Sequence, residues 1–149
     1  MKLKIISVGH LKKGSEYRLL FEMYRKRLRW DLEAFEIDSR KYTRPLDQEN
    51  RILSAIPDQS YVFALDETGK TLSSNSFAQN INKLKEEYYT SLCFIIGPAE
   101  GLTQALKDRA NFLMSFGKQT WPHQLVRVML IEQLYRAQQI LAGHPYHRD

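Results

Sequence analysis

The chain has 149 residues, the size of one ordinary domain, and we expect residues 1–149 to fold as a single unit. Its hydrophobic fraction of 43% and charged fraction of 26% are typical of a soluble globular protein, and no run approaches the ~20 apolar residues of a transmembrane helix. The formal net charge is +5, and residues 1–44 carry 12 Lys and Arg against 6 Asp and Glu. This composition predicts no membrane partner. The basic N-terminal part is either a contact surface for a polyanion such as RNA or a solvated face of a basic protein.

Cysteine and histidine usage indicates the compartment and argues against a metal site. The single Cys93 lies in an apolar run and has no partner for an intrachain disulfide, so a reducing, cytoplasmic location is expected. One Cys and four scattered His residues do not have the spacing of zinc ligands, so we expect no bound metal.

The first half of the chain alternates strand and helix patterns. Residues 2–8 alternate apolar and polar side chains, which predicts a strand, and residues 32–37 predict a second one. Ser15 is placed to cap a helix that runs to about Arg29. A basic loop over 38–45 leads to a short helix over 47–56, which Pro57 ends.

The second half repeats this alternation with more apolar strands. Residues 61–65 and 92–96 are apolar throughout, as expected for strands buried on both faces, and residues 112–116 predict a fifth strand. A turn is expected over 66–70 and a loop over 117–121. The helices are expected from Ser73 or Ser74 to about Tyr89, over 102–109, and from Pro122, in the first turn, onward.

Alternating strands and helices predict an α/β domain with a mostly parallel sheet of five or six strands and helices on both faces. In such sheets ligands bind outside the carboxyl ends of the strands. The loops that follow Leu65, Ile96 and Phe116 leave three of those ends, so we expect them to form one site.

Two of these loops have features of a binding site. In residues 97–101 two glycines let the backbone approach a ligand closely, although neither a G-x-G-x-x-G nor a Walker A motif is present, which argues against a nucleoside triphosphatase. Residues 116–122 are suited to present backbone N–H and C=O groups to a planar ring such as adenine, with Phe116 or Trp121 as an apolar wall. The alternative is a connecting loop with Trp121 packed in the core.

The last helix and the tail that follows it carry the remaining polar candidates. His123 lies four residues before Arg127, and Glu132 four before Arg136, so each pair shares a helix face. The simpler readings are a helix-start His123 that bonds the backbone, and an exposed ion pair worth tenths of a kcal/mol. The broad apolar surface of this helix predicts a dimer interface.

Several motifs, taken in order, resemble those of the ribosomal RNA large subunit methyltransferase H family. The resemblance is strongest near the C-terminus and covers the whole chain. It rests on residues 4–9, 65–70, 95–97, 100–102, 115–116, 122–128, 131–137 and 144–148.

The resemblance implies a SPOUT-type α/β knot, with a C-terminal trefoil knot that holds S-adenosylmethionine in a bent pose. It also implies a homodimer that methylates N3 of a pseudouridine in the helix 69 loop of 23S rRNA, in the assembled 70S ribosome. Pro98 departs from the family pattern, because a second glycine is common there. By motif matching, the cofactor contacts fall on Leu65, Gly97, Phe116, Gly117, Lys118, Gln119, Thr120 and Trp121.

The candidates for removing the imide proton or stabilising charge are His123, Glu132, Tyr146, His147 and Arg148. We expect the tail to hold the target nucleotide, with Arg148 on a phosphate or a developing oxyanion. The expected ribosome contacts are basic residues of the N-terminal part: Arg25, Lys26, Arg27, Arg29, Arg40 and Lys41.

Two other functions are compatible with the same residues. One is a ribosome-binding factor without catalytic activity, for which Pro98 is the only hint. The other is a methyltransferase with another RNA target, such as a tRNA base.

Overall fold

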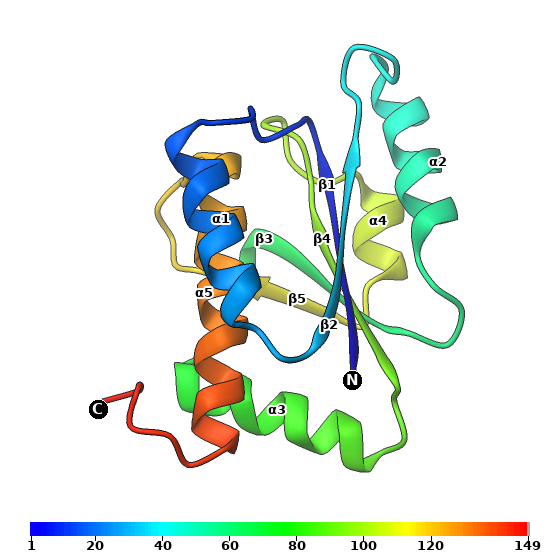
Figure 1. Ribbon diagram of the computed structural model, residues 1–149. Helices are drawn as coiled ribbons and strands as arrows, with labels where there is room; N and C mark the ends of the chain where they lie inside the picture. The colour runs from blue at the N-terminus through cyan, green and yellow to red at the C-terminus, as the bar shows by residue number, and fades with distance from the viewer. Residues whose placement is uncertain (149) are drawn as a thin grey trace.

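The computed structural model describes residues 1–148, which form one sheet with helices on both faces (Figure 1). All four strand pairings are parallel, and the strand order is β2-β1-β4-β3-β5. The strands are β1 (Lys2–Val8), β2 (Asp31–Ile37), β3 (Tyr61–Thr71), β4 (Ser91–Ile96) and β5 (Phe112–Ser115). The predicted parallel α/β architecture is confirmed, with five strands.

Three helices cover one face of the sheet and two cover the other (Figure 1). The first group is α1 (Glu16–Arg27), α3 (Ser74–Glu86) and α5 (His123–Leu141), and the second is α2 (Pro45–Ala55) and α4 (Gln104–Arg109). Ser15, Ser73 and Thr103 cap α1, α3 and α4 by accepting a backbone N–H of the first turn. These hydroxyls satisfy donors that would otherwise lack a partner at a helix start.

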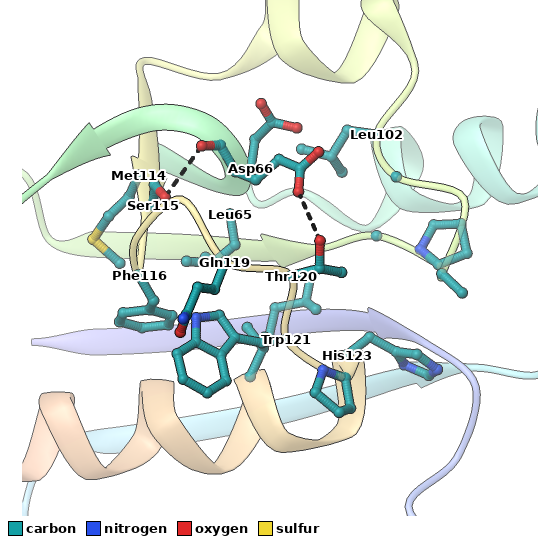
Figure 2. A pocket seen from close by; sticks show the side chains of 18 of the residues that line it. Leu65, Asp66, Leu102, Met114, Ser115, Phe116, Gln119, Thr120, Trp121 and His123 are labelled. Atoms are coloured by element: carbon teal, nitrogen blue, oxygen red, sulfur yellow. Dashed lines mark hydrogen bonds between the residues drawn. The ribbon is translucent and has the colours of Figure 1, made fainter.

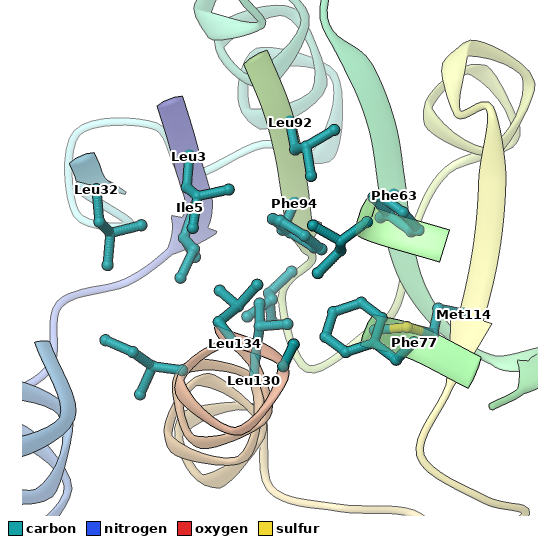
Figure 3. Close-up of a cluster of buried hydrophobic side chains, with 14 of the residues drawn as sticks. Leu3, Ile5, Leu32, Phe63, Phe77, Leu92, Phe94, Met114, Leu130 and Leu134 are labelled. Atoms are coloured by element: carbon teal, nitrogen blue, oxygen red, sulfur yellow. The ribbon is translucent and has the colours of Figure 1, made fainter. Parts of the chain in front are cut away.

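The first part of β3, residues 61–65, and most of β4 are buried between the helices on the two faces, which explains why these segments are apolar. On the side of α5, the rings of Phe63 and Phe94 stack with centroids 4.9 Å apart, and Leu130 and Leu134 pack against the same cluster (Figure 3). On the opposite side, Cys93 lies in the smaller core formed with α2 and α4. Between these two cores the sheet is a rigid support for the loops at its carboxyl edge.

The chain turns out of the sheet after Leu65 as expected, but β3 does not end there and continues to Thr71. Leu65 and Lys70 both pair with Met114 of β5, so residues 66–69 loop out of the ladder and the chain then returns to it. A Cβ on Gly69 would lie 2.6 Å from the backbone of Leu113, so only glycine fits where the strand rejoins β5. The polar residues 66–69 favour a turn, and the pairing of Lys70 and Thr71 with β5 makes the strand resume after it.

Two helix ends also differ from expectation. Helix α1 ends at Arg27 rather than near Arg29, and α3 ends at Glu86 rather than near Tyr89. Tyr88 adopts a positive φ of 70°, which takes the chain out of the helix. Within residues 1–148, no helix is both long and apolar enough to cross a membrane. The trefoil knot stays a prediction.

Candidate functional site

A cleft of about 580 Å³ lies at the carboxyl ends of β4 and β5 and beside residues 65–67 in the middle of β3 (Figure 2). The three loops predicted from the sequence line it together, as expected for a parallel sheet. Of the proposed cofactor residues, seven line this cleft and Lys118 does not; the seven are Leu65, Gly97, Phe116, Gly117, Gln119, Thr120 and Trp121.

The cleft combines apolar walls with three acidic lining residues. Leu65, Leu102 and Met114 supply apolar surface, and the acidic residues are Asp66, Glu67 and Glu100, of which Asp66 is largely buried and pairs with Lys107 at 3.7 Å. Trp121 is 38% exposed and lines the cleft, so the alternative that it packs in the core is wrong. A volume of several hundred Å³ with mostly apolar walls and a few polar groups is typical of a small-molecule site.

The buried Ser115 holds the cleft loops together. Its hydroxyl donates to the carbonyl of Gly117 at 2.7 Å and accepts from the Gly117 N–H at 3.0 Å. The same hydroxyl lies 3.3 Å from the carbonyl of Glu67, whose carboxylate accepts from Thr120 at 3.4 Å (Figure 2). The looped-out part of β3 is therefore attached to the segment before α5.

Residues 97–101 form a tight turn despite the proline. The carbonyl of Pro98 accepts from the N–H of Gly101 at 2.9 Å, and Gly101 has a φ of +93°. A Cβ on Gly97 would lie 2.8 Å from a methyl group of Leu102, which lines the cleft. Leu102 therefore packs closely on the backbone of Gly97, and Pro98 takes part in the turn through its carbonyl.

His123 stands at the cleft beside a buried ion pair. Its Nδ1 lies 3.5 Å from a terminal nitrogen of Arg127, which is 2% exposed. Arg127 donates to a carboxylate oxygen of Glu36 at 3.0 Å and to the carbonyls of Val8 and Gly9 at 2.6 and 2.8 Å. The start of α5 is therefore fixed to the carboxyl ends of β1 and β2.

Burial and neighbouring groups shift the pKa values of Glu36, Arg127 and His123. Burial alone would raise the pKa of Glu36, but the bond from the Leu11 N–H and the Arg18 guanidinium outweigh it and lower the pKa. Burial lowers the pKa of Arg127 to about 10, which leaves it cationic at neutral pH. Burial and then the Arg127 charge lower the pKa of His123, so its imidazole is neutral at pH 7.

The tail is docked on α5 through a second group of side chains. Oε1 of Glu132 accepts from Arg136 at 2.5 and 2.9 Å and from the hydroxyl of Tyr146 at 3.2 Å. Arg136 also lies over the Tyr146 ring and 3.2 Å from Nδ1 of His147. The simpler reading of Glu132 and Arg136 as an exposed pair is wrong, because both are largely buried and hold the tail.

Tyr146 is held as a neutral phenol. Burial raises its pKa, and the neighbouring Tyr24 and Glu132 raise it further. The ring of Tyr135 meets it edge-on with centroids 4.8 Å apart. These contacts make Tyr146 a hydrogen-bond donor and a support for the tail rather than a proton acceptor.

The structure splits the five proposed catalytic residues into two groups. His123 lines the cleft, whereas Glu132 is about 14 Å further along α5 and Tyr146, His147 and the exposed Arg148 follow the end of that helix (Figure 1). Within one chain the tail residues do not line the cleft. In the described residues no group of three or more His, Cys, Asp or Glu side chains is arranged to hold a metal ion.

Comparison with known proteins identifies the family. The family described as predicted SPOUT methyltransferase matches residues 1–147. The chain is 43% identical over 152 residues to a ribosomal RNA large subunit methyltransferase H from Rhodospirillum centenum, covering 99% of both chains. The chain belongs to the ribosomal RNA large subunit methyltransferase H family. A relative of that name from Nitrobacter hamburgensis is 41% identical over 160 residues, again covering 99% of each chain.

A solved structure shares the fold of this SPOUT methyltransferase. It is that of a probable methylase family protein from Haemophilus influenzae, with a TM-score of 0.60 over 99% of this chain and 70% of that chain. The two sequences are 11% identical, so the likeness concerns the fold alone.

The basic residues of this SPOUT methyltransferase fall at two ends of the sheet. One group lies in the last turn of α1 and the loop before β2, and the other follows β2, about 20 Å away along the strand. The first contains Arg25, Lys26, Arg27 and Arg29, and the second contains Arg40 and Lys41. Only the second lies at the carboxyl edge of the sheet, where the cleft opens, and the exposed Lys12 and Lys13 lie at that edge too.

Proposed function

We propose that this protein transfers a methyl group from S-adenosylmethionine to N3 of a pseudouridine in the helix 69 loop of 23S rRNA, acting as a homodimer on the assembled 70S ribosome. One observation carries the proposal. A ligand-sized cleft is built by the three loops whose sequences match this family, in a chain whose relatives are named as rRNA methyltransferases.

The residues of the cleft fit this cofactor. Its apolar walls and the backbone groups of residues 116–121 suit an adenine ring, and the lining carboxylates of Glu67 and Glu100 would favour a cationic sulfonium, whereas Asp66 is already paired with Lys107. When bound, the cofactor supplies an electrophilic methyl group on a good leaving group. The protein's task is then to align the acceptor base and to assist the loss of its imide proton.

With the cofactor bound, N3 of the base would accept the methyl carbon as the carbon–sulfur bond breaks, and the electron pair of that bond would remain on sulfur. The N3 proton leaves to a base, and the transient negative charge spreads over the neighbouring ring oxygens. Arg148 is exposed and available for a phosphate or such an oxygen, and Tyr146 is neutral. We assign the tail residues His147 and Arg148 to the target nucleotide.

A homodimer would bring the tail of one protomer to the cleft of the other. Support comes from the separation of the two groups within one chain, and from exposed apolar surface next to α5. Helix α1, which packs beside α5, leaves Leu19 and Leu20 64% and 41% exposed. Burial of such surface in a dimer is favourable.

A methylation assay with tritiated cofactor tests the proposed function. We expect label on 23S rRNA in 70S ribosomes, little on isolated subunits and none on tRNA, with the modified base mapped to helix 69. Calorimetric titration of S-adenosylmethionine runs beside it. Label on tRNA instead of ribosomes would support the other RNA target, and the absence of any binding heat would support a factor without catalytic activity.

Charge reversal of the basic residues should weaken ribosome binding without changing cofactor affinity. We expect Arg40→Glu/Lys41→Glu to bind ribosomes at least ~10-fold more weakly, with a salt dependence reduced by about one unit of slope per phosphate contact removed. Binding is measured by sedimentation over a range of salt concentrations. The matched control is Lys83→Glu/Lys85→Glu on α3, and equal effects of the two pairs would contradict a specific contact at the carboxyl edge.

A further inference from the structure

The hydrogen bonds of Arg127 determine which nitrogen of His123 carries the proton. The guanidinium has four terminal hydrogens, and three go to the carbonyls of Val8 and Gly9 and to Glu36. The fourth, on the nitrogen that bonds Val8, faces Nδ1 of His123 at 3.5 Å. Arginine has only donors, so Nδ1 must accept. The neutral imidazole then carries its proton on Nε2.

The Arg127 guanidinium is held in place by several contacts. Glu36 receives the Leu11 N–H at 2.7 Å and the Arg18 guanidinium at 2.8 Å, in addition to Arg127. Arg127 itself is 2% exposed. A buried guanidinium fixed by a carboxylate and two carbonyls has little freedom to turn away from His123, and its terminal hydrogens need no acceptor other than these four.

We propose that Arg127 is a positioning residue that fixes His123 as the neutral Nε2–H tautomer, so that His123 offers the cleft a hydrogen-bond donor instead of a proton acceptor. The role of that donor rests on the proposed methyl transfer. The Nε2–H of His123 donates to an oxygen of the bound ligand, either a carbonyl of the target base or a carboxylate of the cofactor. In the first case it stabilises the charge that develops as N3 loses its proton.

The surroundings of His123 agree with a neutral donor. Burial and the Arg127 charge both lower its pKa, and the more distant Glu100 opposes them only in part. A general base beside a fixed cation would gain a proton at an electrostatic cost, whereas a donor with its proton on Nε2 avoids that cost.

Nitrogen NMR of the histidine side chains tests the tautomer directly. In the full-length protein at pH 7 we expect His123, assigned by its absence in His123→Gln, to show an unprotonated Nδ1 and a protonated Nε2. In Arg127→Met, which retains the Glu36–Arg18 pair, both tautomers should be populated and the pKa of His123 should rise. A wild-type His123 protonated on Nδ1 would overturn the proposal. These outcomes do not depend on any methylation activity.

Kinetics of two His123 variants test the role of the donor and do not require an Arg127 variant to fold. His123→Gln retains an N–H donor and should keep turnover within ~10-fold of wild type, whereas His123→Ala should lose roughly 100-fold. Equal inactivity of the two variants would mean that His123 accepts the proton, which overturns the proposal. A loss confined to turnover with ribosomes assigns the acceptor to the base, and a loss of S-adenosylmethionine affinity assigns it to the cofactor.

Discussion

Two variants that are each inactive should regain methyl transfer when they form one dimer. Arg148→Ala removes the exposed tail cation, and Gly97→Val fills the cleft, where even a Cβ would lie 2.8 Å from Leu102. We expect each homodimer to lose at least ~100-fold in turnover. In the heterodimer the wild-type tail of one protomer meets the wild-type cleft of the other, so one of the two sites is complete and about half the wild-type rate should return.

Heterodimers are isolated by placing different affinity tags on the two protomers and are assayed on 70S ribosomes. The matched control pairs Arg148→Ala with a protomer that carries both changes, which leaves no complete site. Calorimetry should show that Arg148→Ala and His147→Ala keep wild-type affinity for S-adenosylmethionine, because neither residue lines the cleft of its own chain and both are assigned to the target nucleotide. A verified heterodimer without activity would show that the tail does not act on the partner's cleft.

The cleft was predictable because the strands that carry its loops have a clear apolar pattern in the sequence. The apolar runs over 61–65 and 92–96 belong to strands buried on both faces, and parallel strands present their carboxyl ends at one edge. Residues that follow Leu65, Ile96 and Phe116 were therefore expected at one edge of the sheet, and the strand order places β4, β3 and β5 side by side. The family resemblance then singled out members of the same loops, and the structure places all but Lys118 on the cleft wall.

The parts that were not predictable depend on contacts between distant residues. The sequence does not mark Glu36 as a partner of Arg127, because their bond spans 91 positions. The spacing of His123 and Arg127 was a usable signal, since it placed both on one helix face. It did not reveal that Arg127 points into the sheet edge and is buried.

Contacts between distant residues also decide the structure of the looped-out residues 66–69 and of the tail. A run of Asp, Glu, Thr and Gly favours a turn, and only the pairing of Lys70 and Thr71 with β5 shows that the strand resumes. A polar C-terminal tail is normally frayed, yet Arg136 and Glu132 hold this one in place through Tyr146 and His147. In both cases tertiary contacts decide the structure of a segment whose local preference is weak.

Removal of the Glu36 carboxylate should strongly destabilise the folded protein. Glu36→Leu leaves the buried Arg127 without its counter-ion and also removes partners of Arg18 and the Leu11 N–H. Loss of one member of a buried ion pair costs about 3–5 kcal/mol, because the other charge stays desolvated. We therefore expect the free energy of unfolding in urea to fall by that amount at pH 7.

The pH dependence of the stability gives an independent check that loss of the Glu36 carboxylate is the cause. The pKa of Glu36 is lowered in the folded state, so its carboxylate stabilises the protein fully above the ordinary pKa of a glutamate. That stabilisation is lost as the pH falls through the lower pKa of the folded state. The stability difference between wild type and Glu36→Leu should therefore shrink on acidification below about pH 4. The matched control is Glu33→Leu on the same strand, whose carboxylate is 61% exposed and 3.6 Å from Lys4, and it should change stability by less than about 0.5 kcal/mol. Equal losses in the two variants, or a difference that does not depend on pH, would show that the Glu36–Arg127 pair does not anchor α5 to the sheet.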